Sequence, residues 1–424
     1  MARTSILSDE LLRQLVAVGQ VDILVGVPTF NNAATIASLV KTLHVGLAKH
    51  FPRERTVLIS PDGGSNDGTP DLVRMAPLAD AEMNGSSTLR TTHRVSAPYR
   101  GLPGRAMGVR TVFAAADLLQ ARAVVLIDAN LTSMTPDWVA ELARPVWKDQ
   151  ADLVVPVHPR SRFEGPLLSQ MVRPLLGTAY GRRLRTTLAT DFSCSGPFAT
   201  RLVGHAMWEE DLTLQSFAVW LIATALAGDL RIGQVHLGEC RFGPAIARPS
   251  LAELFGHVVG ATFGSLDKYA ASWTSRDGVA EVPVDGEPGE LNGPEPEVAY
   301  APLVERFRAG VRDLEPVLRD ILAPGTLANL QAAAAAEGEV PRISDRLWVS
   351  TVYEFAASGH RGVMNREHLT QALVPFYLGR TASFFAEIAS ADETAVRERT
   401  SALEREYEDQ RPYLLELWNA EGGR

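Results

Sequence analysis

Asp128 and Asn130 place two oxygen-bearing side chains directly after a strongly apolar run. Residues 123–127, AVVLI, are predicted to form a buried strand, and only Ala129 separates the two polar residues that follow it. Open parallel sheets bind their ligands at the carboxyl ends of their strands. Two such side chains on alternate residues can face one divalent cation, because hard cations prefer oxygen ligands. A polar turn that merely ends the strand would have the same composition, so this pair alone does not distinguish a cation site from a turn.

Polar groups also follow the first two predicted strands. After the strand DILVGV come Pro28, Thr29, Phe30, Asn31 and Asn32. Asn31 or Asn32 could hydrogen-bond a ligand or simply cap the next helix. After TVLISP, Asp62 begins the turn DGGSNDG, where glycines permit close backbone approach and Asp62 could accept a hydrogen bond from a base or a ribose. A solvated turn is the alternative.

A third loop, YRGLPGRAMG, places Arg100 and Arg105 among glycines at the start of a predicted helix. Guanidinium groups beside the orphan N–H groups of a helix start suit a diphosphate, although an exposed arginine explains the pattern equally well. Strands alternate with helices from residue 21 to about 240, which predicts right-handed crossovers and a mainly parallel α/β sheet. The loops above should therefore meet at one edge of that sheet.

The order VGVPTFNNAATI, ISPDGGSNDGT, GLPGRAMGVR and VVLIDANL resembles the nucleotide-sugar-binding half of GT-A glycosyltransferases, with a Rossmann-like sheet. The later segments VRPLLGTAYGRRLR, DFSCSGPFATRLV and IGQVHLGECRFG resemble glucosyl-3-phosphoglycerate synthases and related enzymes that make glucosyl- or mannosylglycerate. This resemblance implies retaining transfer of glucose or mannose from a nucleotide-diphosphate sugar donor to a small anionic acceptor such as D-glycerate or 3-phosphoglycerate. The product would be a compatible solute or its precursor, and the cofactor Mg²⁺ or Mn²⁺.

The resemblance also assigns roles to individual residues. It implies nucleotide-sugar binding by Pro28, Thr29, Phe30, Asn32, Asp62, Arg105, Asp128 and Arg241. It implies metal binding by Asp128 and Asn130, and acceptor binding by Ser195, Gly196 and Arg185. Three positions depart from the family pattern. Asn130 stands in place of an aspartate, Phe242 and Gly243 occupy the region of a metal-binding histidine, and Pro103 lies where a basic residue is expected.

The segment MWEEDLTLQSF offers an alternative mechanism. It places Glu210 and Asp211 in the region where inverting GT-A enzymes carry their catalytic base, and an acidic helix start would look the same. A retaining enzyme needs no such base, because the departing phosphate oxygen can take the proton. A second alternative is a catalytically silent nucleotide-binding or assembly protein.

Six arginines lie near the predicted acceptor segment: Arg160, Arg162, Arg173, Arg182, Arg183 and Arg185. They would favour binding of a carboxylate or a phosphate, or they form a solvated face or a subunit contact.

The composition is that of a soluble globular protein. The 424 residues carry a net charge of -9, which argues against a nucleic-acid partner, and the apolar run 217–228 is too short to span a membrane. Two cysteines exclude a disulfide framework. We expect a cytoplasmic homodimer with an N-terminal helix (1–20), an α/β domain (21–271), a linker or loop (272–300) and an all-α C-terminal domain (301–424) that packs on the first domain or on a second subunit.

Overall fold

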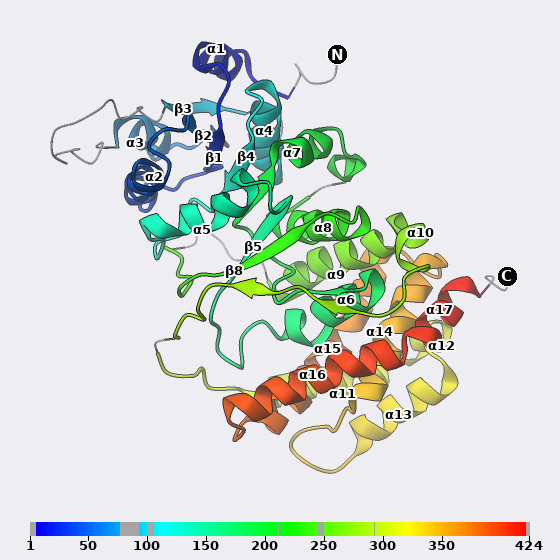
Figure 1. Ribbon diagram of the computed structural model, residues 1–424. Helices are drawn as coiled ribbons and strands as arrows, with labels where there is room; N and C mark the ends of the chain where they lie inside the picture. The colour runs from blue at the N-terminus through cyan, green and yellow to red at the C-terminus, as the bar shows by residue number, and fades with distance from the viewer. Residues whose placement is uncertain are drawn as a thin grey trace.

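Figure 1 shows a central sheet with helices on both faces and a group of C-terminal helices on one side. The computed structural model describes residues 6–76, 93–99, 105–210, 212–244, 250–291 and 293–420. Within these residues the main sheet has eight strands in the order β10-β8-β5-β7-β4-β1-β2-β3, and β7 is antiparallel to its neighbours. The strands are β1 (Ile23–Gly26), β2 (Thr56–Asp62), β3 (His93–Pro98), β4 (Ala123–Leu126), β5 (Leu153–Val157), β7 (Phe192–Ser195), β8 (Ile232–His236) and β10 (Val284–Asp285).

Both faces of this sheet are buried, as the sequence of β4 illustrates. Ala123 and Val125 pack in one apolar core, whereas Val124 and Leu126 pack in the core on the opposite face. Successive side chains of a strand point to opposite faces, so a sheet covered on both sides needs apolar residues at every position. The first core includes α2 (Ile36–His50), α3 (Thr69–Met75) and α5 (Pro136–Trp147). The second includes α1 (Asp9–Val18), α4 (Arg105–Leu118), α6 (Arg173–Tyr180), α7 (Gly196–Val203), α8 (Leu214–Ala227) and α9 (Leu251–Lys268).

Local sequence explains where several helices begin. The Ser8 hydroxyl accepts the N–H of Leu11 at 3.3 Å and caps α1, as its sequence predicts. Ser250 and Glu253 form a capping box at the start of α9. The predicted buried helix around residues 217–228 is confirmed, because α8 is apolar and buried on nearly all sides. Among the described residues no helix is long and apolar enough to cross a membrane.

The C-terminal third is helical and packs against the sheet region. Gln170, in a π-helical turn (Leu168–Val172), joins the two parts: its carbonyl oxygen accepts the indole N–H of Trp348 at 2.6 Å and the hydroxyl of Tyr407 at 3.0 Å. Its side-chain oxygen accepts the Nε–H of Arg380 at 3.0 Å. The helices are α11 (Tyr300–Asp313), α12 (Glu315–Ile321), α13 (Pro324–Ala335), α14 (Asp345–His360), α15 (Arg366–Ile388), α16 (Glu393–Asp409) and α17 (Arg411–Asn419). Their apolar residues continue the second core of the sheet.

The segment 272–300, for which the sequence predicts a linker or loop, contributes two short strands. β10 pairs with β8 at the edge of the main sheet, and β9 (Ala280–Glu281) pairs with β6 (Arg182–Arg183) in a separate two-stranded sheet. Backbone pairing of this kind needs no apolar periodicity, which is why the sequence does not reveal it. The predicted fold class is confirmed: a mainly parallel α/β sheet flanked by helices, with a C-terminal all-α region.

The crossing of α11 over α15 generates a stability prediction. A Cβ added to Gly310 would lie 2.2 Å from the Cβ of Pro375, so Gly310→Ala must push the two helices apart. We expect a loss of about 1–3 kcal/mol, the usual cost of overpacking, measured as a lower midpoint of urea unfolding. Gly325→Ala is the matched control, since a Cβ there meets nothing within 4 Å. An unchanged midpoint for Gly310→Ala would contradict the close crossing.

Candidate active site at the carboxyl edge of the sheet

Seven segments of the chain meet at one edge of the sheet. The parallel registers align Gly26, at the end of β1, with Ile59 of β2 and Leu126 of β4, so these strands leave the sheet close together. β7 runs the opposite way, and its first residue, Phe192, pairs with Leu126. Asp191 therefore reaches the same edge from the amino end of its strand. We call this edge the rim; it comprises residues 28–32, 62–65, 99, 128–130, 158–160, 190–191 and 237–243.

Asp62 ties the first two rim loops together. Its Oδ1 accepts the hydroxyls of Thr29 at 3.0 Å and Ser65 at 2.6 Å. Its Oδ2 accepts the backbone N–H groups of Gly64 at 2.9 Å and Ser65 at 2.8 Å. A carboxylate has about four lone-pair directions, and these four donors use them. Asp62 therefore orders the two loops, and its bond to a base or a ribose stays a prediction.

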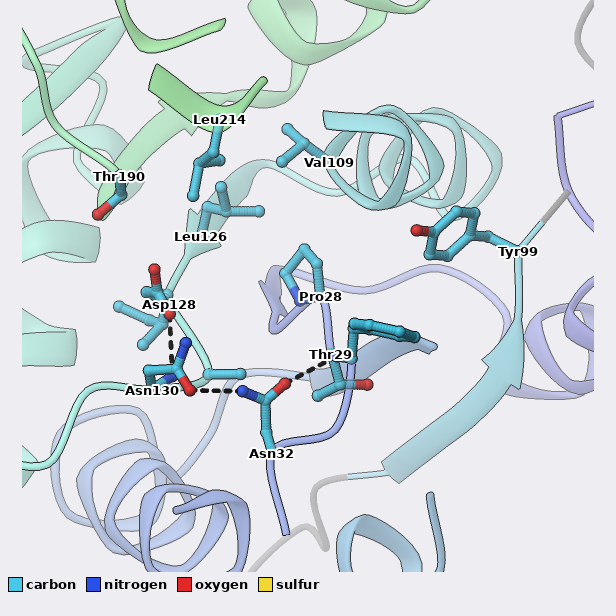
Figure 2. A pocket seen from close by; sticks show the side chains of 13 residues that line it. Pro28, Thr29, Asn32, Tyr99, Val109, Leu126, Asp128, Asn130, Thr190 and Leu214 are labelled. Atoms are coloured by element: carbon cyan, nitrogen blue, oxygen red, sulfur yellow. Dashed lines mark hydrogen bonds between the residues drawn. The ribbon is translucent and has the colours of Figure 1, made fainter. Parts of the chain in front are cut away.

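A chain of hydrogen bonds links the first loop to the predicted metal pair (Figure 2). The Asn32 side-chain oxygen accepts the N–H of Phe30 at 2.7 Å, and its amide nitrogen donates to Asn130 Oδ1 at 2.6 Å. The N–H of Asn130 donates to Asp128 Oδ1 at 2.9 Å. Because α2 begins only at Ile36, Asn32 is not its capping residue. The amide oxygen of Asn130 accepts the hydrogen bond from Asn32 within the protein. Because an amide is neutral, Asp128 supplies the negative charge of the pair.

The smaller of two adjoining cavities has a volume of about 190 Å³. It is lined by Pro28, Thr29, Phe30, Asn32, Tyr99, Val109, Leu126, Ile127, Asp128, Ala129, Asn130, Thr190 and Leu214. Figure 2 shows Asn32, Asp128 and Asn130 at one end of this cavity and the ring of Tyr99 at the other. One end is therefore polar and the other aromatic. The sequence did not reveal Tyr99, because the strand before it, HRVSAP, has no apolar run to mark it.

The larger cavity, of about 550 Å³, opens beside the first. Both cavities are lined by Asp128, Asn130, Thr190 and Leu214, so they meet at the metal pair. The other polar residues around the larger one are His158, Arg160, Glu164, Thr186, Asp191, Gln215, Glu239 and Cys240. Together the two cavities have the size of an ordinary small-ligand site. An extended ligand could place one end in each.

Asp191 is the carboxylate that the sequence analysis missed. It is buried, and its Oδ1 accepts the backbone N–H of Asp128 at 2.7 Å. Burial and the neighbouring charge of Asp128 raise the pKa of Asp191 to about 7. The sequence signal was an aspartate directly before the short strand FSCS, but only the antiparallel direction of β7 brings Asp191 to the rim.

Ser195 and Gly196, the predicted acceptor-binding residues, lie at the opposite edge of the sheet. Ser195 pairs with Ala123 at the start of β4, and its hydroxyl accepts the N–H of Phe198 to cap α7. A Cβ on Gly196 would lie 1.9 Å from the carbonyl oxygen of Ala121, so a close backbone approach requires this glycine. The structure therefore does not bring this pair to the rim, and a serine before a glycine also marks a plain helix start.

Arg105 and Arg241 are both near the rim. Arg105 opens α4, whose residue Val109 lines the smaller cavity, and the side chain of Arg105 lies outside the described residues. Arg241 is in the loop after β8, where its N–H donates to Ser133 Oγ at 2.9 Å. Its exposed guanidinium pairs with Glu239 at 2.7 Å. The structure thus brings the backbone of Arg241 to the rim, with its side chain turned to a neighbouring carboxylate.

The predicted arginine cluster divides into two groups. Arg160 lines the larger cavity, and Arg185 is exposed beside the lining residue Thr186. Three of the others hold later segments of the chain: Arg162 pairs with Glu295, Arg173 with Glu404, and Arg183 with Glu281, Glu404 and Glu408. The remaining one, Arg182, lies near Asp229 and donates to the carbonyl of Leu230. Most of this positive charge therefore serves packing within the chain.

The acidic segment expected to supply an inverting base is placed only in part. Glu210 follows the 3-10 helix Ala206–Glu209, is exposed, and does not line either cavity. Asp211 lies outside the described residues. Further along, Leu214 and Gln215 reach the larger cavity. The carboxylates that do line the cavities are Asp128, Glu164, Asp191 and Glu239.

No family model matches the chain, and no curated protein matches it. Solved structures of glucosyl-3-phosphoglycerate synthase from Mycobacterium tuberculosis are similar to it. The complex with Mn²⁺, UDP and glucosyl-3-phosphoglycerate is 21% identical, with a TM-score of 0.41, over 60% of this chain and 83% of that one. The complex with Mn²⁺, UDP-glucose and phosphoglyceric acid is 21% identical, with a TM-score of 0.42, over 62% of this chain and 85% of that one. The function must therefore be argued from the side chains of this chain.

The four bonds to Asp62 generate a prediction for the loops. Asp62→Ala removes every acceptor and should lower the free energy of unfolding by about 3 kcal/mol, because donors are left without partners inside the protein. Asp62→Asn should cost roughly half as much, since its oxygen can still take the two N–H groups and hydroxyls can turn to accept from its nitrogen. Urea unfolding measures both changes, and hydrogen exchange at residues 63–65 locates them. Equal, small losses in the two variants would contradict the ordering role.

Proposed function

We propose that this protein is a glycosyltransferase that moves glucose or mannose from a nucleotide-diphosphate sugar to a small anionic acceptor such as D-glycerate or 3-phosphoglycerate. The observation that carries the proposal is the meeting of two cavities at Asp128 and Asn130 on the rim. A donor and an acceptor placed in adjoining cavities have their reacting atoms near this junction. Such positioning lowers the barrier because it replaces a random encounter by a fixed geometry.

The smaller cavity suits the nucleoside of the donor. The rings of Phe30 and Tyr99 offer apolar surface to a base, and Pro28 stiffens the loop that carries Phe30. The start of α4 lies alongside, because Val109 lines the same cavity, and a helix start attracts phosphate through its unpaired N–H groups. Arg105 is the residue at that start, and we propose that it contacts the diphosphate.

A divalent cation fits the junction of the two cavities in its ligand chemistry. Asp128 offers a carboxylate oxygen there, and Mg²⁺ or Mn²⁺ bound to it would neutralise the charge of the leaving diphosphate. Asn130 adds no charge, and its amide oxygen accepts a hydrogen bond from Asn32. We therefore propose a weakly held cation that binds together with the nucleotide rather than before it.

The larger cavity suits the acceptor. Arg160 lies at its wall and Arg185 is exposed next to the lining residue Thr186, so both can attract a carboxylate or a phosphate. We propose retention of the anomeric configuration, in which the departing phosphate oxygen takes the proton of the acceptor hydroxyl. One observation supports it: Glu210, the described residue of the acidic segment expected to supply an inverting base, lies away from both cavities.

A catalytically silent nucleotide-binding protein is the second candidate. Asn130 favours it, because a neutral amide holds a cation less tightly than an aspartate would, and its oxygen already accepts one hydrogen bond from Asn32. The two candidates differ in product formation and not in nucleotide binding. Incubation with UDP-, GDP- and ADP-sugars plus glycerate or 3-phosphoglycerate, with and without Mg²⁺ or Mn²⁺, separates them by mass spectrometry. NMR of the anomeric proton in any product distinguishes retention from inversion.

Substitutions at Asp128 and Asn130 should have opposite effects on cation binding. Asp128→Asn removes the charge that holds the cation and should reduce transfer by about 100-fold or more, as expected for loss of electrostatic stabilisation at a leaving group. Asn130→Asp adds a charge and can still accept the hydrogen bond from Asn32. It should tighten Mn²⁺ binding in the presence of the nucleoside diphosphate by about tenfold, or 1.4 kcal/mol, measured by electron paramagnetic resonance. Unchanged transfer in Asp128→Asn would reject the proposed role of this carboxylate.

A further inference from the structure

His158 lines the larger cavity and has a buried ring nitrogen with no hydrogen-bond partner among the described residues. Its Nδ1 is 2.8 Å from the carbonyl oxygen of Gly238, which can only accept, so Nδ1 carries the proton. The ring packs against Trp138, with centroids 5.2 Å apart. Its Nε2 is buried and has no hydrogen-bond partner among the described residues. A neutral imidazole held in this way directs a lone pair toward whatever lies at Nε2.

Two other side chains that can bind a metal ion lie close to the His158 ring. A ring nitrogen of His158, a carboxylate oxygen of Asp191 and the sulfur of Cys240 all lie within 4.8 Å of one another. A tetrahedral ion bonded at 2.0–2.3 Å sets separations of roughly 3.3–3.8 Å between its ligands, so small side-chain rotations close the site. All three residues line the larger cavity. They come from separate segments: the end of β5, the residue before β7 and the loop after β8.

We propose that His158, Asp191 and Cys240 bind one divalent transition-metal ion of the zinc type. Nitrogen, sulfur and carboxylate ligands together select such an ion over Mg²⁺ or Ca²⁺, which prefer oxygen alone. Three protein ligands leave a fourth position, and the cavity lies beside it, as in zinc sites that bind water or substrate. The Nδ1 bond to Gly238 is the kind of outer contact that orients metal-binding histidines.

This site differs from the cation site proposed at Asp128 and does not depend on the glycosyltransferase proposal. Its ligands are softer, and Mg²⁺ should not compete for them. Asp191 nevertheless connects the two places, because its Oδ1 accepts the N–H of Asp128. An ion at His158 would also fasten the loop after β8 to the rim, where Gly243 N–H already donates to the carbonyl of Asn130 at 2.8 Å. The ion would thus stabilise the wall shared by both cavities.

Cobalt substitution in protein without an affinity tag tests the proposal. Chelator-treated full-length protein is titrated with Co²⁺ in excess Mg²⁺, and we expect one equivalent to give visible tetrahedral bands and a near-ultraviolet thiolate band that Zn²⁺ abolishes. Cys240→Ser should remove the thiolate band. His158→Asn keeps a donor for Gly238 and Asp191→Asn keeps an acceptor for Asp128, while each removes one ligand. Each should weaken binding by about 100-fold or more, beyond the cost of losing only an outer contact.

The controls use residues of the same type elsewhere in the chain. Cys194→Ala removes the other cysteine, which is buried in β7, and His257→Asn removes an exposed histidine; both should leave the cobalt spectrum unchanged. Near-ultraviolet circular dichroism confirms that each variant is folded, and the near-isosteric Cys240→Ser keeps the test decisive if another variant is not. The proposal is overturned if the unaltered protein shows no thiolate band, or if the band survives in Cys240→Ser.

Discussion

The hydrogen bond from the backbone of Asp128 to the buried carboxylate of Asp191 is the interaction on which the rim depends. It fixes the end of β4 beside the start of β7 and sets two carboxylates next to each other. Burial, together with the nearby charge of Asp128, raises the pKa of Asp191. A cation bound at Asp128 or a metal ion bound at Asp191 would reduce the repulsion between these two carboxylates. Both proposed metal sites therefore draw on the same electrostatic feature.

The rim is also shaped by polar side chains that bind one another rather than a ligand. Asp62 uses its carboxylate to join the loops after β1 and β2, and Asn32 uses its amide to join the first loop to Asn130. Buried polar groups that are fully paired give a loop one defined shape, because every alternative leaves a donor or an acceptor unpaired. The cavity walls are thus set before a ligand arrives. The surfaces left for the ligand are aromatic at one end and anionic at the junction.

The C-terminal helices extend the second core of the sheet, and none of their described residues lines either rim cavity. Gln170 and the arginines at 173 and 183 hold them through buried hydrogen bonds and ion pairs. Sequence alone left open whether those arginines bind an acceptor, face solvent or make a contact between protein segments. The difference lies in their partners, Glu404 and Glu408, which are more than two hundred residues away along the chain. Arg160 is the member of the cluster that faces the larger cavity.

Apolar periodicity and the polar strand ends by themselves determined the α/β class, the helical C-terminal region and the placement of Asp62, Asp128 and Asn130 at one edge, because parallel strands separated by helices must all leave the sheet on the same side. Only the tertiary structure decided the direction of β7. That direction sends Asp191 to the rim and Ser195 to the far edge, although the two are only four positions apart in the sequence. Tertiary contacts also decided that His158 and Cys240 meet, since side chains from distant segments converge only through the register of the strands that carry them.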